Sequence, residues 1–458
     1  MDEETVEGLR KIVGCDWVIY GRDVTSGYLL DETPPPIRPI PSRDVVVVKP
    51  GSVEEVSEVL RYANDRRIPV FPRGGGTGLV GGCIPTLDGV VLSLERMNKI
   101  TVDRENLMAE AEAGATLGDL IKASEKAGLF FPPHPGDEGA QIGGLIACNA
   151  GGARAVKTGV IRNYVRGLEV VLATGEVLRL GGKLMKDNLG YDLMQLIIGS
   201  EGTLAVITKA WIRLYPRLPA TATLIIPFEK RSTAVKAVPR ILQAGILPLA
   251  LEYVEKAPIE RSAQHLGLEW PCKVGESFLI LVLAEPSEEA LYAQCERILS
   301  LCEELGSLEP LLAESREEQD RILKIRSEIY TALKPDMVDI LDATVPPASI
   351  GAFMDEVEHI AERYGTYLPA YGHAGDGNIH VHIMKEEGWS MEDYDKVREE
   401  IYGVAVKLGG TITGEHGVGA VRKGSAAKYM SQTHVALMRG IKRLFDPNGI
   451  LNPGKVLP

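Results

Sequence analysis

PRGGGTGLVGG, residues Pro72 to Gly82, is the stretch that decides the fold of this chain. It has six glycines in eleven residues and lies between two short apolar runs, Ile68–Phe71 and Val90–Leu94, which are typical of strands. Glycine at this density is costly in a plain connection, but it suits backbone that turns sharply and approaches a ligand closely. Exposed N–H groups in such a loop form a concavity for phosphate oxygens, and Arg73 adds a fixed positive charge. A flexible turn is the alternative, because glycine density alone is weak evidence.

The loop does not fit the two commonest nucleotide-binding motifs. Gly76, Gly78 and Gly81 satisfy G-x-G-x-x-G, but that motif needs a helix to begin at the loop and meet the pyrophosphate. Gly82 and Pro85 follow instead, and then a second strand, so no helix can begin there. The sequence G-K-[ST] of a nucleotide-hydrolysing P-loop is also absent. What remains is a strand–loop–strand dinucleotide cradle, which points to a flavin.

Length, charge and cysteine content limit the class of protein. A chain of 458 residues exceeds one ordinary hydrophobic core, so two or three domains are expected. The net charge of −13 argues against nucleic acid as a partner. Six cysteines without a C-x-x-C pair disfavour a zinc ribbon or an iron–sulfur cluster and favour reduced thiols. With no targeting signal and no apolar run of membrane-spanning length, we expect a cytoplasmic protein, which can still associate with the inner face of the membrane.

The first half of the chain shows β-α-β and hairpin patterns. Ser52-Val-Glu-Glu55 is a capping box that predicts a helix to about Arg66, and Thr116 precedes a second helix. The segment Leu196–Tyr215 is expected to form a hairpin that turns at GSEG. Pro132–Gly159 is a second stretch rich in small residues, whose backbone can lie against a flat ring or along a pyrophosphate. Close packing of a helix on a strand is the alternative for this stretch.

The composition changes after Pro216–Pro219. Strand and helix patterns alternate from there on, with long helices expected at about residues 288–305, 350–364 and 391–408. The alternation predicts a separate sheet that carries helices on one face.

Histidine is scarce in the chain, with eight in total, yet His373, His380 and His382 fall within ten residues. His380 and His382 share one face of the strand NIHVHI, because they are two residues apart. The GDGN turn can bring His373 back towards that face. A purely structural role is the alternative for any one of them.

A second glycine-flanked turn, GEHGVG, carries Glu415 and His416. Two imidazoles and one carboxylate suit a divalent metal ion with open positions for a substrate. Asp376 can compete as a ligand, but it stands between two glycines and is expected to fix its turn.

The resemblance to a known family rests on six motifs. PRGGGTGLVGG, IGGLIACNAGGARAVKTG, GSEGTLAVIT, GHAGDGNIHVHI, GEHGVG and LNPGKV occur in the order found in FAD-linked 2-hydroxy-acid dehydrogenases. Over about residues 40–458 the chain resembles the D-lactate dehydrogenase, glycolate oxidase D-subunit and D-2-hydroxyglutarate dehydrogenase branch of the vanillyl-alcohol oxidase/p-cresol methylhydroxylase flavoprotein superfamily.

The resemblance implies an α+β protein with a two-subdomain FAD-binding domain of the p-cresol methylhydroxylase type. It also implies an α+β cap domain, made of an antiparallel sheet and helices, over the flavin ring. We expect residues 1–219 to form the FAD-binding domain, with an N-terminal extension at 1–43. Residues 220–405 are then the cap domain, and residues 406–458 return to the FAD domain and complete the active site.

Roles for the metal and base residues follow from the same motifs. His373, His380 and Glu415 match the metal ligands of the family, and His416 matches the catalytic base. Zinc, manganese or iron is the expected metal.

The substrate site is implied in the same way. Arg326, in KIRSEIY, matches the arginine that binds the substrate carboxylate, and its alternative is one more helix charge. Asn378 or His382 is expected to line the site, although the family often has asparagine where His382 stands.

The flavin is expected to contact the glycine-rich stretches and the motifs that follow them. Some members of the superfamily attach FAD through a histidine in the first glycine loop; Thr77 occupies that place here, so the FAD should be non-covalent. The predicted cofactor contacts are Pro72, Arg73, Gly74, Gly75, Gly76, Thr77, Gly78, Gly81, Pro135, Gly136, Gly143, Gly144, Ala147, Asn149, Gly152, Gly159, Glu201, Gly202, Ile207 and Asn452.

The implied activity is the FAD- and metal-dependent oxidation of a D-2-hydroxy acid to the 2-oxo acid. D-Lactate is the first choice of substrate, with glycolate or D-2-hydroxyglutarate as alternatives. Electrons are expected to leave to a separate quinone, electron-transfer flavoprotein, cytochrome or iron–sulfur protein, and a homodimer is compatible with the sequence. Three other functions stay open: a flavoenzyme of this fold that oxidises alcohols or makes ether lipids, a metal-dependent hydrolase, and a non-catalytic flavin-binding subunit.

Overall fold

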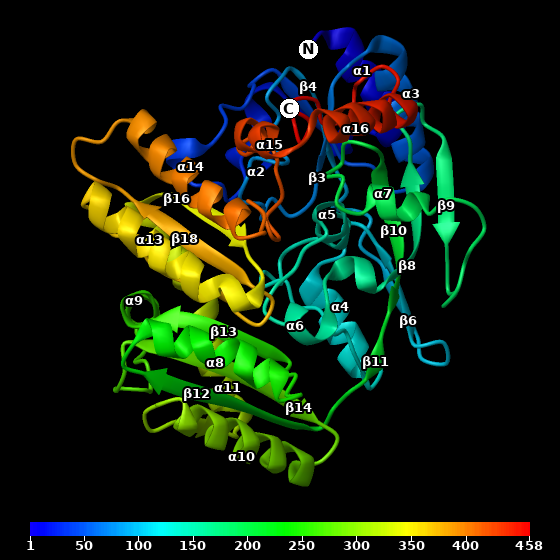
Figure 1. The fold of residues 1–458 in the computed structure, drawn as a ribbon. Helices are drawn as coiled ribbons and strands as arrows, with labels where there is room; N and C mark the ends of the chain where they lie inside the picture. Colours follow the sequence, from blue (N-terminus) through cyan, green and yellow to red (C-terminus); the bar gives the residue numbers. More distant parts are fainter.

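The chain folds into two parts, each built on its own sheets (Figure 1). The structure, a computed structural model, describes residues 1–458. Helices and strands are mixed throughout, which confirms the expected α+β class. The α-helices are α1 Glu3–Val13, α2 Ser26–Leu29, α3 Val53–Arg66, α4 Leu117–Lys126, α5 Ile142–Cys148, α6 Ala155–Thr158, α7 Leu193–Ile197, α8 Arg231–Gln243, α9 Lys256–His265, α10 Glu288–Glu304, α11 Arg316–Ser327, α12 Ile329–Leu333, α13 Ile350–Tyr364, α14 Met391–Lys407, α15 Lys423–Tyr429 and α16 Gln432–Phe445.

The first part contains a four-stranded and a five-stranded sheet. The four-stranded sheet has the order β1-β2-β4-β3, with β2, β4 and β3 parallel and β1 antiparallel to β2. The five-stranded sheet, β5-β6-β10-β8-β9, is antiparallel throughout. The strands are β1 Val18–Tyr20, β2 Val45–Val48, β3 Val70–Arg73, β4 Gly89–Ser93, β5 Ile100–Asp103, β6 Met108–Glu112, β8 Val165–Val171, β9 Val177–Gly181 and β10 Val206–Arg213, and a separate pair joins β7 Leu129–Phe130 to β11 Tyr215–Pro216.

Local capping signals account for the two helices predicted in this part. The side chain of Ser52 accepts a hydrogen bond from the Glu55 N–H at 3.3 Å, and the Glu55 carboxylate accepts one from the Gly51 N–H at 2.7 Å. At α4 the capping is reciprocal: the Thr116 hydroxyl accepts a hydrogen bond from the Asp119 N–H at 3.1 Å, and the Asp119 carboxylate accepts one from the Thr116 N–H at 3.3 Å. Each pair satisfies N–H groups that have no partner inside the helix, so both predicted helix starts are confirmed.

The hairpin predicted for Leu196–Tyr215 is wrong. Only its second arm is a strand, β10, because the first arm begins inside α7. Asp192 caps that helix by accepting a hydrogen bond from the Gln195 N–H at 3.2 Å. The chain then turns through GSEG, where Glu201 has the positive φ of 52°. A short capped helix therefore replaces the expected strand.

The second part is organised on one seven-stranded antiparallel sheet of order β15-β12-β14-β13-β17-β18-β16. Its buried apolar residues form one cluster with α8, α10, α13 and α14 and a second cluster with α9, α11 and α12. Helices therefore cover both faces, and the prediction of a single covered face is wrong, because strand residues of both alternating sets are apolar. The strands are β12 Ala220–Phe228, β13 Ala250–Glu255, β14 Ser277–Glu285, β15 Leu311–Ala313, β16 Met337–Thr344, β17 Ala370–His373 and β18 Asn378–Met384.

The end of the chain packs on the first part. The Val70 N–H donates a hydrogen bond to the Ile450 carbonyl at 2.8 Å, and the Asn452 N–H donates one to the Val70 carbonyl at 2.7 Å. Figure 1 shows the red C-terminal helices α15 and α16 beside the blue N-terminal elements. None of the helices is long and apolar enough to cross a membrane.

Candidate active site

The site is built on one face of the seven-stranded sheet, where β13, β17, β18 and β16 lie side by side. Side chains alternate between the faces of a strand, so Ile379, Val381 and Ile383 enter the core against α13 and α14 while His380 points the other way. The register pairs His380 with Asp342 on one neighbouring strand and with Tyr371 on the other.

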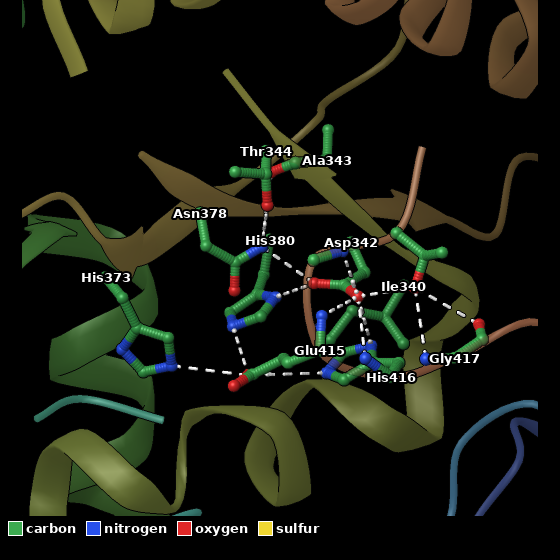
Figure 2. Close-up of polar contacts among 12 residues, drawn as sticks. Ile340, Asp342, Ala343, Thr344, His373, Asn378, His380, Glu415, His416 and Gly417 are labelled. Carbon is green, nitrogen blue, oxygen red and sulfur yellow. Dashed lines mark hydrogen bonds and ion pairs between the residues drawn. The ribbon is translucent and has the colours of Figure 1, made fainter. Parts of the chain in front are cut away.

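Three imidazoles converge on one carboxylate oxygen, Oε1 of Glu415 (Figure 2). The Nε2 atoms of His373, His380 and His416 lie 3.3, 3.4 and 3.8 Å from it. The rings of His380 and His416 are stacked almost parallel, with centroids 5.0 Å apart. The structure thus brings together four of the five residues that the two histidine-bearing motifs singled out, all except His382, and none of the four is exposed.

The opposite nitrogen of each imidazole faces a second carboxylate. His373 Nδ1 lies 2.7 Å from Glu252 Oε1, while the Nδ1 atoms of His380 and His416 lie 3.6 and 4.0 Å from the Asp342 carboxylate. Carboxylates in this position orient an imidazole and direct its other nitrogen towards a metal ion. The three Nε2 atoms and the Glu415 carboxylate therefore form a donor set that suits a divalent cation.

Asp342 also stands close enough to count among the donors, since one ligand atom from each of Asp342, His380, Glu415 and His416 lies within 4.8 Å of the other three. Its Oδ2 atom, however, accepts hydrogen bonds from the Thr413 hydroxyl at 2.9 Å and from three backbone N–H groups, those of residues 414, 415 and 416, each at 2.8 Å. An oxygen with four donors has little capacity left for a metal. We therefore assign Asp342 to holding the turn and the imidazoles.

Sequence reasoning missed Glu252 and Asp342. Glu252 is the one acidic residue in the apolar strand pattern LALEYV, Asp342 is one of two in MVDILDATV together with Asp339, and all three are almost fully buried. Buried acidic residues are rare unless they have a partner, so this contrast was a usable signal.

Charges in the cluster support one another. Burial opposes the charged imidazolium of His373, but the Glu252 and Glu415 carboxylates outweigh burial and hold the pKa of His373 well above its ordinary value. Burial likewise opposes the charged form of Glu415, yet His373 and His380 hold its pKa well below the ordinary value. Burial, the largest cause, lowers the pKa of His380 and so favours its neutral form. The site therefore favours an anionic Glu415 beside a cationic His373, and a neutral imidazole such as that of His380 can bind a metal ion.

Arg326 reaches the edge of this cluster from the end of α11. Its Nη2 lies 2.5 Å from Glu252 Oε2, and its guanidinium lies 4.7 Å from the centre of the Tyr371 ring. The side chain is mostly buried, and its Nε has no hydrogen-bond partner in the protein. Arg326 therefore lies beside the cluster of His373, His380, Glu415 and His416, which we call the metal-type cluster. Its Nε–H is free to donate a hydrogen bond, so Arg326 is not simply a solvated charge on a helix.

The other predicted residues of the HxGDGNxHxH segment have different surroundings. Asn378 donates through Nδ2 to Asp342 Oδ1 at 2.8 Å, which leaves only its Oδ1 without a partner. His382 is fully buried, its Nδ1 lies 3.1 Å from the Met337 sulfur, and the structure does not bring it to Glu415. Asp376 accepts a hydrogen bond from the Asn378 N–H at 3.1 Å, as expected of a turn residue, and burial raises its pKa to about 7.

The first glycine loop offers an unsatisfied row of donors. None of the backbone N–H groups from Gly75 to Val80 donates a hydrogen bond within the protein. Arg73 folds back over the loop, since a Cβ on Gly76 would lie on its guanidinium. A row of free N–H groups beside a guanidinium fits a pyrophosphate, and so it fits FAD. The Val80 carbonyl accepts hydrogen bonds from the N–H groups of Ala420 and Val421, which joins this loop to the chain just after His416.

The second small-residue stretch lies against both the loop and the metal-type cluster. A Cβ on Gly74 would lie 3.5 Å from the Gly144 Cα, and one on Gly151 would lie 2.7 Å from Glu415 Oε2. Gly143 instead packs against Ala113, the residue that follows β6, so the packing interpretation holds at that position.

The remaining predicted cofactor residues fall into three groups. Asn452 joins two of the loops, because its Nδ2 donates to the carbonyls of Gly82 and Glu201 at 2.9 and 2.8 Å. Contacts among backbone segments also bring together Pro72 with Gly202, Pro135 with Gly152, and Ala147 with Glu201. Gly81 donates its N–H to the Thr33 hydroxyl, and Gly136 has positive φ with open space around it. The other three contact residues of the first part: Asn149 accepts a hydrogen bond from the Arg162 N–H, Gly159 lies against Asn163, and Ile207 pairs with Val170 of β8.

Comparisons with known proteins agree with this architecture. A family described as "FAD linked oxidases, C-terminal domain" matches residues 217–456, and one described as "FAD binding domain" matches residues 45–181. The chain is 46% identical over 433 residues to a D-lactate dehydrogenase of Archaeoglobus fulgidus, covering 94% of this chain and 96% of that protein. It is 38% identical over 422 residues to the glycolate oxidase subunit GlcD of Bacillus subtilis, covering 90% and 88%. Among solved structures, p-cresol methylhydroxylase shares the fold with a TM-score of 0.75, at 18% identity over 99% of this chain and 96% of that one.

Proposed function

This chain belongs to the FAD-linked D-2-hydroxy-acid dehydrogenases, and we propose from that premise that it oxidises D-lactate to the 2-oxo acid. Glycolate and D-2-hydroxyglutarate are the alternative substrates. The observation that carries the proposal is the convergence of three imidazoles on Glu415 beside the buried Arg326. D-Lactate is preferred because the relative at 46% identity is a D-lactate dehydrogenase.

FAD would be held by the glycine loop, whose free N–H groups and Arg73 would meet the pyrophosphate. When bound, FAD supplies the acceptor for the hydride that leaves the substrate carbon. We assign residues 1–219 to this FAD-binding role, residues 220–405 to the cap domain, and residues 406–458 to the segment that completes the site. Because the chain has no C-x-x-C pair, electrons would pass to a separate acceptor such as a quinone, an electron-transfer flavoprotein, a cytochrome or an iron–sulfur protein.

A divalent ion would be held by His373, His380 and Glu415, with Glu252 and Asp342 orienting the imidazoles. When bound, such an ion supplies a positive charge that lowers the pKa of the substrate hydroxyl. Zinc, manganese and iron all accept this set of nitrogen and oxygen donors.

Four side chains of the protein are proposed to act on the substrate. His416 takes the hydroxyl proton on its Nε2 as a general base. Arg326 pairs with the substrate carboxylate through its planar donors and so fixes which hydrogen faces the flavin. Asn378 and His382 are proposed to line the space around the substrate.

The first prediction concerns the attachment of the cofactor. Thr77 stands where linked members of the superfamily carry a histidine, and threonine offers no such nucleophile. Acid precipitation of the purified yellow protein should therefore release all flavin into the supernatant. Flavin that stays on the washed pellet would show a covalent link and refute this part of the proposal.

The second prediction concerns the substrate carboxylate. Arg326→Lys keeps a positive charge but loses the two-pronged geometry, so KM for the hydroxy acid should rise with FAD binding unchanged. Loss of one charge-assisted pair corresponds to about 1.5–3 kcal/mol, or roughly 10–150-fold in kcat/KM. Arg261→Lys is the matched control: it changes a partly exposed arginine that pairs with Asp336 and with the Ala332 carbonyl, and it should keep wild-type kinetics. Unaltered kinetics in Arg326→Lys would remove Arg326 from the substrate site.

The proposed function is tested with a panel of D- and L-2-hydroxy acids and an artificial dye as electron acceptor. We expect D-lactate to give the highest kcat/KM and the L-enantiomers to be poor substrates. If glycolate or D-2-hydroxyglutarate gives the highest value, the reaction class stands and the substrate assignment changes. If no 2-hydroxy acid reduces the dye, the proposed function is wrong.

A further inference from the structure

Two buried carboxylates from different parts of the chain, those of Asp342 and Glu201, accept hydrogen bonds from the turn that carries Glu415 and His416. On its N-terminal side, Asp342 of β16 accepts the N–H groups of residues 414, 415 and 416. On its C-terminal side, the carboxylate oxygens of Glu201 accept the N–H groups of Val418 and Gly419, each at 2.8 Å. Only Gly417 separates the two sets of hydrogen bonds.

Glu201 is itself held rigidly by the first part of the molecule. Its N–H donates to the Ala147 carbonyl at 2.8 Å, and its carbonyl accepts a hydrogen bond from Asn452 Nδ2 at 2.8 Å. Its φ of 52° lies in the left-handed region, which a residue other than glycine adopts only when its surroundings require it. The side chain is buried, and both of its oxygens face the turn.

The contact between Glu201 and the turn leaves no free space. Gly417 has a φ of 85°, and a Cβ there would lie 2.8 Å from Glu201 Oε1. Both carboxylate oxygens are already engaged by the turn, so a direct bond from this carboxylate to a cofactor would compete with two existing hydrogen bonds.

We propose that Glu201 is a positioning residue that fixes the Glu415–His416 turn relative to the FAD-binding part of the chain. The inference rests on the proposed function and deepens it. His416 must face a substrate that lies between the metal-type cluster and the flavin, and these two belong to different parts of the molecule. Asp342 fixes the turn to the cap sheet, and Glu201 fixes it to the glycine loops. Without the second attachment, His416 keeps its chemistry but loses its alignment, and a misplacement of about 1 Å can cost roughly 100-fold in rate.

The test compares Glu201→Gln with Glu169→Gln in the intact flavoprotein. An amide has one acceptor oxygen, so glutamine at 201 can satisfy one N–H of the turn while its NH₂ group opposes the other. Glu169 is the matched control, because it is also buried in the first part and accepts hydrogen bonds from Arg179 Nε at 2.9 Å and the Thr208 hydroxyl at 3.1 Å, away from the turn. For each variant we would measure the FAD-to-protein ratio, the rate of metal release to a chelator, and the rate and substrate Kd of flavin reduction by D-lactate.

We expect Glu201→Gln to keep a wild-type FAD ratio and substrate Kd, to reduce flavin about 10–100-fold more slowly, and to release metal several-fold faster. Glu169→Gln should match wild type in all of these. Wild-type reduction and metal-release rates in Glu201→Gln, or a loss of FAD in place of these changes, would overturn the inference.

Two other results are possible: a wild-type protein that no 2-hydroxy acid reduces, and a Glu201→Gln variant that does not fold. If wild-type protein is not reduced by any 2-hydroxy acid, the proposed function fails, and the metal-release comparison still decides whether Glu201 holds the turn. If Glu201→Gln does not fold, Gly417→Ala replaces it, because the added methyl group collides with the Glu201 carboxylate from the other side. The same slower reduction with retained FAD supports the inference there, and wild-type rates contradict it.

Discussion

Replacement of His416 by alanine is expected to lower the rate of flavin reduction about 10²–10⁴-fold, the usual range for a general base, while FAD and metal remain bound. The imidazole stacks on His380, and its Nε2 is the farthest of the three from Glu415 Oε1, at 3.8 Å. His373 and His380 lie closer, at 3.3 and 3.4 Å, so they can hold a metal ion with Glu415 when His416 is absent.

The measurement is stopped-flow flavin reduction by D-lactate, together with metal and FAD analysis of the same sample. His359→Ala, an exposed histidine of α13, is the matched control and should behave as wild type. If His416→Ala empties the metal site while Glu415→Ala leaves it filled, the roles of the two residues are reversed.

Replacement of Glu415 by alanine should instead remove the metal. Its Oε1 is the common point of all three imidazoles, so the variant leaves only nitrogen donors and no anionic ligand. Loss of an orienting partner alone typically costs 10–100-fold in metal affinity, and loss of a direct ligand should cost more than about 100-fold. Activity should fall with the metal content and return in part when excess divalent ion is added.

Titration of the metal-free protein with zinc, manganese or iron, followed by a direct metal assay, measures the expected loss of metal affinity in Glu415→Ala. Glu356→Ala, which removes an exposed carboxylate of α13, is the control. A Glu415→Ala protein with a full complement of metal and a wild-type rate would show that the turn is structural and that the proposed mechanism is wrong.

The sequence predicts much of the fold, because some residues allow only a few backbone conformations. The glycine loop followed by Pro85 excluded a helix, and the structure has strand β3, the loop and then strand β4. Capping pairs such as Ser52 with Glu55 fixed helix starts, because they satisfy specific N–H groups. The family assignment needed the motifs in combination, and the comparisons confirm it.

The remaining features depend on contacts between distant residues. Nothing local in LALEYV says that Glu252 will meet His373, because the two strands become neighbours only through the order of the sheet. The helix α7 was missed because Asp192 and its cap lie before the segment that was interpreted as a hairpin. The role of Glu201 depends on a hydrogen bond across more than two hundred residues of sequence.

If this protein transfers hydride from a D-2-hydroxy acid to its own flavin, as we propose, the substrate alone should bleach the flavin when no oxygen is present. Purified protein would be mixed with D-lactate, glycolate or D-2-hydroxyglutarate in the absence of oxygen and of any acceptor, with L-lactate as the control. We expect the yellow absorbance of oxidised FAD to disappear with the D-acid within a single turnover and to persist with L-lactate. A flavin that stays oxidised with every 2-hydroxy acid, although the protein contains both FAD and metal, would show that the protein does not transfer hydride from these acids to its flavin.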